Sequence, residues 1–296
     1  MNKVGLHFAY WIVNDVSRNL DEYIALTKKA NVDVMEIPQD FVMSMNAGEI
    51  TDLKAKLADN GLLINFNGGL SPKTDIASDD PAIRENGVEY SKRALEAISR
   101  AGGAVWSGIN YSAWLRRPEA GFLTPDEKNR ILELSVCSMR KIIKTAEDVG
   151  VTYGIEVVNR FEQFLLNTAA EGIAYCEMVD SPNAKLLLDT FHMNIEEDDI
   201  RDSIANAQLA GRLSHFHIGE SNRRVPGIRA SHMDWKGIFG AIKTSGYGGY
   251  ITMEPFVAMG NTAICVWRDM AADVSDEALI ADAAKGAEFI REMLGN

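Results

Sequence analysis

Residues 124–160 decide the fold, and they read TPDEKNRILELSVCSMRKIIKTAEDVGVTYGIEVVNR. A capping hydroxyl on Thr124 precedes a proline at the first helical position, which is a strong start signal for a helix. Gly150 ends that helix, because glycine adopts the left-handed conformation at low cost. A short apolar run at residues 153–158 follows directly. The segment therefore predicts one helix followed by one buried strand.

The same alternation of helix and strand extends over all 296 residues. Strands with near-continuous apolar runs, separated by helices, predict a parallel sheet that helices cover. Eight such units favour a closed (β/α)₈ TIM barrel, one catalytic domain over residues 1–296, and leave an open doubly wound sheet as the alternative. No G-x-G-x-x-G turn follows the first strand, which disfavours that open sheet. The expected strands are residues 4–10, 32–37, 62–67, 104–110, 153–158, 186–189, 213–218 and 250–254.

Two features mark the connections between these strands. Thr168 and Ser275 are expected to open later helices, and Gly61 and Gly211 are expected to end others, by the same capping rules. The connections at residues 71–81 and 111–123 are longer than a helix and a turn require. In a barrel both would lie on the catalytic face, where long loops form pocket walls.

Composition narrows the class of protein. With 46% hydrophobic and 24% charged residues, the chain is typical of globular proteins. A net charge of −12 argues against nucleic acid or an anionic membrane as partner. No run approaches the roughly 20 apolar residues of a membrane span, so we expect a cytoplasmic protein. Cys137, Cys176 and Cys265 are not spaced along the sequence as metal-binding cysteines are, and we expect them to be reduced thiols in the core.

Four consecutive strand ends each carry a residue that can bind a metal. Glu156 lies in GIEVVNR, Asp189 in KLLLDTF, His217 in LSHFHIGE and Glu254 in YITMEPF. The carboxyl ends of barrel strands meet on one face, so these side chains can converge. Three buried carboxylates repel one another, and a divalent cation removes that repulsion. The sequence therefore predicts one metal ion bound by these four residues.

The ligand set also indicates which metal is bound. Three carboxylates and one imidazole suit Mn²⁺, Mg²⁺ or Co²⁺ better than structural zinc. His215 is expected to point to the opposite side of its strand from His217. We therefore assign the ligand to His217, which is nearer the end of the strand.

Other polar and aromatic residues follow the same strands and suit a sugar ligand. Glu162, His192 and Arg223 lie in the adjoining loops and supply donors and acceptors for hydroxyl and carbonyl oxygens. A surface arginine is the alternative for Arg223, and a core or helix-start histidine is the alternative for His192. Trp114 is expected to wall a sugar pocket with Phe8, Trp11 and Trp106, unless these aromatic residues belong to the core.

At these residues the chain resembles the D-tagatose/D-allulose (psicose) 3-epimerase family of the xylose-isomerase-like TIM barrels. The segments that carry the resemblance are MNKVG and AYW at the start, IEVVNRFEQ, LDTFHMNIEE, HFHIGESNRR, MEPF and VWRDM, spread over residues 1–270. The resemblance implies a free ketose as substrate, Mn²⁺ or Co²⁺ as cofactor, and a homodimer or homotetramer. It implies metal binding by Glu156, Asp189, His217 and Glu254, and substrate contacts at Glu162, His192 and Arg223.

The implied reaction is the interconversion of ketoses that differ at C3. The substrate pairs are D-tagatose/D-sorbose, D-fructose/D-allulose or ribulose/xylulose. The metal would polarise the C2 carbonyl, so that a carboxylate can remove the C3 proton and leave a cis-enediolate. Inversion needs a second acid on the opposite face, and Glu156 and Glu254 are the candidates for the two catalytic groups. His192 and Arg223 would stabilise the charge that develops on oxygen.

The chain departs from the family in the region expected to bind the far end of the sugar. His7 stands where the family generally has an aromatic residue. Near the positions of Asn65 and Asn67, the family generally has smaller apolar residues. We expect His7 to contact the substrate, with a histidine bonded inside the barrel as the alternative.

Three other functions remain open. An aldose–ketose or hydroxypyruvate isomerase can use the same metal site. A phosphodiesterase or endonuclease is disfavoured by only five histidines and the lack of a basic stretch. The third is a sugar-binding protein without catalysis.

Overall fold

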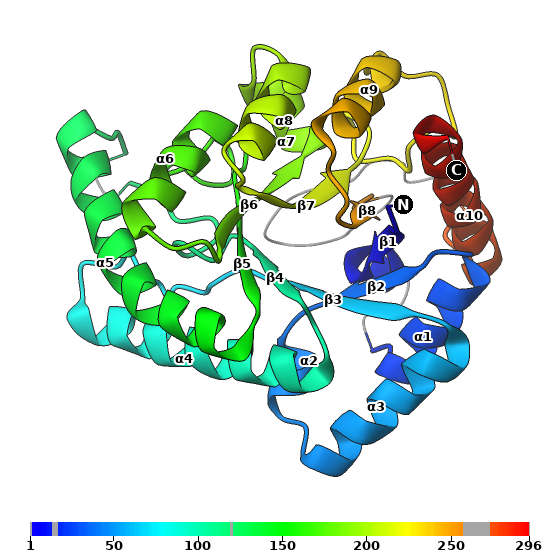
Figure 1. Ribbon diagram of the computed structural model, residues 1–296, viewed down its shortest axis with the longest axis horizontal. Helices are drawn as coiled ribbons and strands as arrows, with labels where there is room; N and C mark the ends of the chain where they lie inside the picture. Colours follow the sequence, from blue (N-terminus) through cyan, green and yellow to red (C-terminus); the bar gives the residue numbers. More distant parts are fainter. Residues whose placement is uncertain (1, 14–16, 119–120, 257–272, 296) are drawn as a thin grey trace.

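The structure is a computed structural model that describes residues 2–13, 17–118, 121–256 and 273–295. Its parallel strands close into one barrel in the order β1 to β8, with β1 paired to β8 (Figure 1). This closure excludes the open doubly wound sheet and confirms the predicted fold class. The strands are β1 Val4–His7, β2 Val34–Ile37, β3 Leu63–Asn67, β4 Val105–Gly108, β5 Thr152–Glu156, β6 Ala184–Asp189, β7 Leu213–Ile218 and β8 Ile251–Met253.

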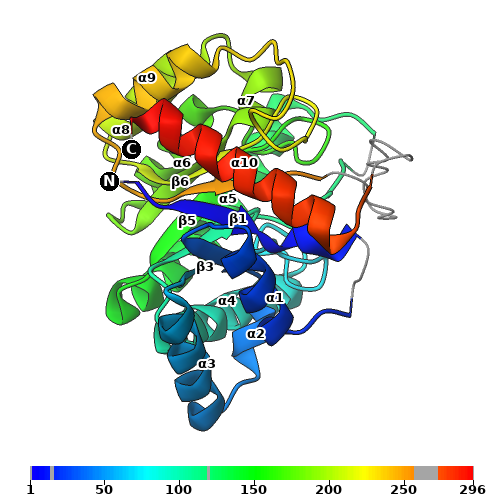
Figure 2. The same cartoon turned by 90° about the vertical axis from the view of Figure 1, so that its right-hand side faces the viewer.

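Helices surround the barrel on its outside (Figures 1 and 2). No helix among the described residues is long and apolar enough to cross a membrane. The helices are the 3₁₀ helix η1 Phe8–Val13, α1 Leu20–Lys29, α2 Asp40–Met43, α3 Ala47–Asn60, α4 Pro81–Ala101, α5 Pro125–Val149, α6 Ala169–Val179, α7 Thr190–Glu196, α8 Ile200–Leu209, α9 Trp235–Ser245 and α10 Asp276–Leu294.

The capping signals act as the sequence predicted. Thr124 and Thr168 each form a capping box, and Ser275 accepts a hydrogen bond from the first turn of α10. Gly61 and Gly150 end their helices in the left-handed conformation. The first strand is shorter than expected. It ends at residue 7, where the chain turns into η1.

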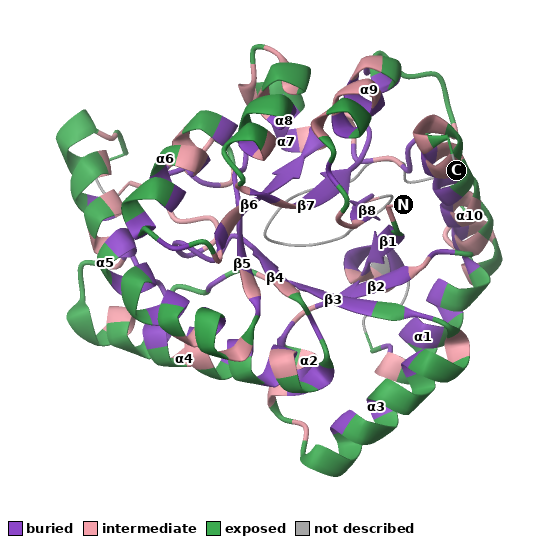
Figure 3. Ribbon diagram, in the orientation of Figure 1, coloured by how far each residue is buried: buried purple, intermediate pink, exposed green. Residues whose placement is uncertain are grey.

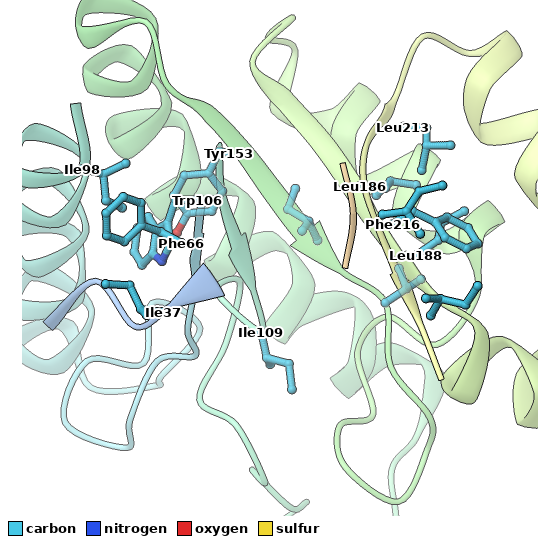
Figure 4. Close-up of a cluster of buried hydrophobic side chains, with 14 of the residues drawn as sticks. Ile37, Phe66, Ile98, Trp106, Ile109, Tyr153, Leu186, Leu188, Leu213 and Phe216 are labelled. Carbon is cyan, nitrogen blue, oxygen red and sulfur yellow. The ribbon is translucent and has the colours of Figure 1, made fainter. Parts of the chain in front are cut away.

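Apolar side chains on the outer face of the barrel form the core with the helices. Most strand residues are buried, whereas the helices expose their outer surfaces (Figure 3). Phe66, Trp106 and Tyr153 from three neighbouring strands pack together with Ile98 of α4 (Figure 4). The rings of Trp106 and Tyr153 meet edge to face with centroids 5.1 Å apart. This layer fixes the strands, and thereby fixes the side chains on their inner faces.

One of the two described cysteines is buried and the other is exposed. Cys176 is buried in α6, as predicted, but Cys137 is exposed on α5. The prediction of a core thiol at Cys137 was therefore wrong, because an amphipathic helix also carries small residues on its outer face. Cys265 lies outside the described residues.

The inner face of the barrel carries small and polar residues. A Cβ atom at Gly5 would lie 2.4 Å from Thr252 Oγ1, so glycine leaves the space that polar neighbours fill. Glu36, Asn65 and His215 are all fully buried in this interior. Buried polar groups must bond to one another, and this requirement shapes the site at the carboxyl ends of the strands.

Two long loops adjoin that site. Residues 70 and 113 form an isolated parallel bridge between them. The Asp75 carboxylate accepts hydrogen bonds from Ala113 N at 3.0 Å and from Arg116 at 3.2 Å. The bridge and these hydrogen bonds therefore hold the described parts of the connections at residues 71–81 and 111–123 against each other.

Candidate metal centre and active site

The four residues predicted to bind a metal converge at one end of the barrel. Glu156 and Asp189 are the last residues of β5 and β6, His217 precedes the last residue of β7, and Glu254 follows β8. One ligand atom from each residue lies within 4.8 Å of the others, and we call these four residues the metal cluster. All four side chains are buried. The strand register produces this convergence, since it places Asp189 opposite His217.

Buried carboxyl groups lie close together in this cluster, with Arg223 as a neighbouring cation. Burial raises the pKa of the Glu156 carboxyl well above its ordinary value, and the neighbouring Glu254 raises it further. Burial opposes ionisation of Glu254 too, but Arg223 and His217 hold its pKa well below the ordinary value. Three oxygen donors and one nitrogen suit Mn²⁺, Co²⁺ or Mg²⁺. The donor set therefore fits a divalent ion.

Arg223 is part of this centre rather than a surface residue. Its Nη1 donates to Asp189 Oδ2 at 2.5 Å and to Glu254 Oε2 at 2.9 Å. The guanidinium lies over the rings of Phe191 at 4.0 Å and Phe256 at 4.8 Å. Arg223 also has a positive φ of 59°, which is uncommon outside glycine and often found at functional sites.

His192 presents one N–H group to the same place. Its Nδ1 accepts a hydrogen bond from the backbone N–H of Asn159 at 3.1 Å, so the proton of the neutral ring is on Nε2. Burial, followed by the charge of Arg223, lowers the pKa of His192 to about 4, which keeps the ring neutral at pH 7. Arg223 Nη2 lies 3.0 Å from this Nε2. The guanidinium can only donate, so at this separation both N–H groups need an acceptor, which a ligand oxygen can supply.

A cavity of about 300 Å³ opens in front of the cluster. This volume is at the lower end of the range of about 300–1,000 Å³ for small-molecule sites. Trp114 donates from Nε1 to Glu162 Oε2 at 3.1 Å, which fixes two residues of the wall. The lining includes these predicted site residues: Glu156, Glu254, Glu162, His192, Arg223, His7, Trp114 and Phe8.

Other predicted wall residues lie elsewhere. Trp11 and Trp106 are buried in the core. Asn67 lines the cavity, but Asn65 lies deeper and donates to Glu36 Oε2 at 2.6 Å. The expectation that Asn65 faces the far end of a sugar was therefore wrong. The VWRDM segment lies outside the described residues.

The predicted orientation of His215 was also wrong. Residues two apart on a strand point to the same face, and the rings of His215 and His217 lie 4.9 Å apart inside the barrel. Glu36 lies between them, with His215 Nε2 and His217 Nε2 each 2.6 Å from one of its carboxylate oxygens. The sequence reasoning missed Glu36, although a charge inside the apolar run at residues 32–37 was the signal already used for the metal ligands.

Comparisons with known proteins agree with this geometry. The chain belongs to the xylose isomerase-like TIM barrel family, whose model matches residues 24–293. It is 37% identical to D-psicose 3-epimerase of Ruminiclostridium cellulolyticum over 99% of this chain and 98% of that protein. It is 34% identical to L-ribulose 3-epimerase of Mesorhizobium japonicum over 92% of this chain and 89% of that protein.

A solved structure extends the likeness to three dimensions. The structure of D-psicose 3-epimerase with D-tagatose from Clostridium cellulolyticum H10 superposes with a TM-score of 0.90 at 36% identity, covering 99% of both chains. The family predicted from the sequence is therefore confirmed. So is the predicted class of enzyme, a carbohydrate epimerase among the isomerases.

Proposed function

We propose that the chain is a metal-dependent ketose 3-epimerase that inverts C3 of a free ketose by removing a proton and returning one to the opposite face. The observation that carries this proposal is that Glu156 and Glu254, from different strands, both line the cavity and both belong to the metal cluster. Inversion of a carbon needs two acid/base groups beside it.

The metal has a limited part in this proposal. A divalent ion held by Glu156, Asp189, His217 and Glu254 supplies a Lewis acid that polarises a carbonyl and acidifies the adjacent C–H bond. Mn²⁺ is the first candidate, with Co²⁺ and Mg²⁺ as alternatives.

The remaining residues bind and orient the sugar. His192 Nε2–H and Arg223 Nη2 donate to an oxygen near the reacting carbon, where negative charge develops. Glu162, held by Trp114, accepts a hydrogen bond from a hydroxyl group. Trp114 walls the cavity for the rest of the sugar, and His7, which also lines it, lies with Nδ1 3.6 Å from Glu254 Oε1.

The preferred ketose stays open within this proposal. By their names, the relatives act on D-psicose and on L-ribulose, a hexose and a pentose. The candidates for this chain are therefore D-tagatose/D-sorbose, D-fructose/D-allulose and ribulose/xylulose. A cytoplasmic location and a homodimer or homotetramer stay predictions from the sequence.

The test is incubation of free ketohexoses and ketopentoses with the enzyme, Mn²⁺ or Co²⁺, and D₂O. The proposal predicts the C3 epimer with deuterium at C3 and none at C1. Label at C1 would instead indicate an aldose–ketose isomerase. Turnover of no ketose would favour a binding protein. Glu156→Gln and Glu254→Gln are each expected to lower kcat by about 10²–10⁴-fold, as loss of a general acid or base does, while sugar binding partly survives.

A further inference from the structure

Glu36 is a buried carboxylate deeper in the barrel than the metal cluster. It lies in β2, and its residue is fully buried. Its Oε1 accepts a hydrogen bond from His217 Nε2 at 2.6 Å. Its Oε2 accepts from His215 Nε2 at 2.6 Å, from Asn65 Nδ2 at 2.6 Å, and from Thr252 Oγ1 at 3.4 Å. One oxygen therefore serves His217, and the other is shared by three donors.

This arrangement fixes which nitrogen of His217 carries the proton. A carboxylate only accepts hydrogen bonds, so the contact requires an N–H at Nε2 of His217. The neutral ring then has its lone pair on Nδ1. In the metal-free site, Nδ1 faces the metal cluster 3.1 Å from Glu254 Oε2 and donates a second proton to that carboxylate instead. A metal ion that displaces this proton would find the Nδ1 lone pair aimed into the metal cluster, while the Nε2–H of His217 stays bonded to Glu36.

We propose that Glu36 is a positioning residue, which holds His217 in the tautomer and orientation that place the Nδ1 lone pair in the metal cluster. The ring of His215 packs edge to face against that of His217, with centroids 4.9 Å apart and an interplanar angle of 79°. A histidine that binds a metal through one nitrogen and donates the other N–H to a carboxylate is both oriented and made more basic. The inference rests on the metal site of the proposed function.

A different reading of the same residues is a second metal site. Glu36, His215 and His217 offer ligand atoms close enough to hold an ion. However, a neutral His217 has one lone pair and cannot serve two ions. Both nitrogen–oxygen separations of 2.6 Å are those of short, charge-assisted hydrogen bonds. The geometry therefore assigns Glu36 to support of the first site, and the number of bound ions tests this assignment.

The experiment is calorimetric titration of the metal-free, full-length protein with Mn²⁺. The wild type is expected to bind one ion per chain. Glu36→Gln is expected to bind it about 10–100-fold more weakly, the loss typical of such supporting residues, because an amide cannot accept from both imidazoles. Asp75→Asn is the matched control, since Asp75 is also a buried carboxylate whose described donors lie outside the cluster. Its affinity for Mn²⁺ should equal that of the wild type.

Each outcome decides the inference. Equal Mn²⁺ affinity in Glu36→Gln and wild type would overturn it, and so would two ions in the wild type with one lost in the variant. A wild type that binds no metal and epimerises no ketose would instead overturn the proposed function. If Glu36→Gln does not fold, long-range ¹H–¹⁵N spectra of the Mg²⁺-loaded wild type give the answer. The inference predicts a protonated Nε2 on His217, and an unprotonated Nε2 would refute it.

Discussion

Replacing Glu156 with glutamine is expected to stabilise the metal-free protein and to remove most of the stabilisation that a metal gives. In the metal cluster, Glu156 lies close to Asp189 and Glu254, and all three carboxyl groups are buried. Without a cation, the folded protein must either tolerate their repulsion or bind a proton at an unfavourable pH. An uncharged amide of the same size avoids both costs, but it is a much weaker metal ligand.

The separation of the ligand atoms sets the magnitude. Two unit charges at the 4.8 Å limit of the cluster repel by about 3.5 kcal/mol at an effective dielectric constant of about 20. Attraction of Glu156 to His217 and Arg223 offsets part of this repulsion. We therefore expect a net gain of about 1–3 kcal/mol, by analogy with other replacements of buried charges by neutral groups. Each kcal/mol corresponds to about 2–4 °C in Tm for chains of about 150–250 residues.

Differential scanning calorimetry at pH 7, in EDTA and then in excess Mn²⁺, measures both effects. The wild type should gain about 2.7 kcal/mol at a Mn²⁺ concentration of about 100 Kd, and Glu156→Gln should gain little. Glu162→Gln is the control, because Glu162 lines the cavity but is outside the cluster. It should keep the Mn²⁺ response. A lower Tm of Glu156→Gln in EDTA, or an undiminished response to Mn²⁺, would refute the reasoning.

The raised pKa of Glu156 determines how the stability advantage of Glu156→Gln changes with pH. Because the pKa of Glu156 is higher in the folded protein than in the unfolded chain, the free energy of unfolding falls as the pH rises through the folded-state value. Below the ordinary glutamate pKa the carboxyl is protonated in both states and has no such effect. The advantage of Glu156→Gln in EDTA should therefore shrink as the pH falls. An advantage that grew at low pH would show that repulsion is not its cause.

Two further changes test the support of the site and the barrel interior. Asn159→Ala removes the side-chain contact of 2.7 Å to His192 Nδ1 and should raise KM for the ketose about tenfold, the equivalent of one hydrogen bond of about 1.4 kcal/mol; an unchanged KM in steady-state kinetics would contradict this role. Gly5→Ala places a Cβ 2.4 Å from Thr252 Oγ1 and should lower the free energy of unfolding in urea by about 1–3 kcal/mol. Gly240→Ala, whose Cβ would meet no described atom within 4 Å, should instead raise it by up to about 1 kcal/mol.

The barrel and the metal cluster could be predicted because both depend on local signals. A carboxylate such as Asp189 at the end of an apolar strand is visible in a window of a few residues. The closed parallel order then brings such strand ends together without any knowledge of side-chain contacts. Arg223 and His192 were harder to judge. Their burial depends on contacts of Arg223 with Phe191 and Phe256 and of His192 with Asn159, and each contact joins segments about 30 residues or more apart in the sequence.

The error about His215 has a simpler origin. The two-residue period of a strand places His215 and His217 on one face, and the same period, applied correctly, predicts two inward imidazoles. Two such rings in a barrel interior need an acceptor, since each has an N–H to satisfy. Glu36 in an apolar strand is the obvious acceptor. Counting donors against acceptors on the inward positions would therefore have found Glu36 from the sequence.

Residues inside the barrel fall into two kinds according to their depth. His215 and Thr252 each precede a residue of the metal cluster by two positions, so they lie one inward position deeper, and both donate to Glu36. Substrate cannot reach that depth, so changes there should alter metal affinity and stability more than the choice of ketose. His7 and Trp114 line the cavity instead. Because His7 Nδ1 lies 3.6 Å from Glu254 Oε1, Trp114 is the cleaner test: its change should alter the choice of ketose and leave the affinity for the metal largely as it is.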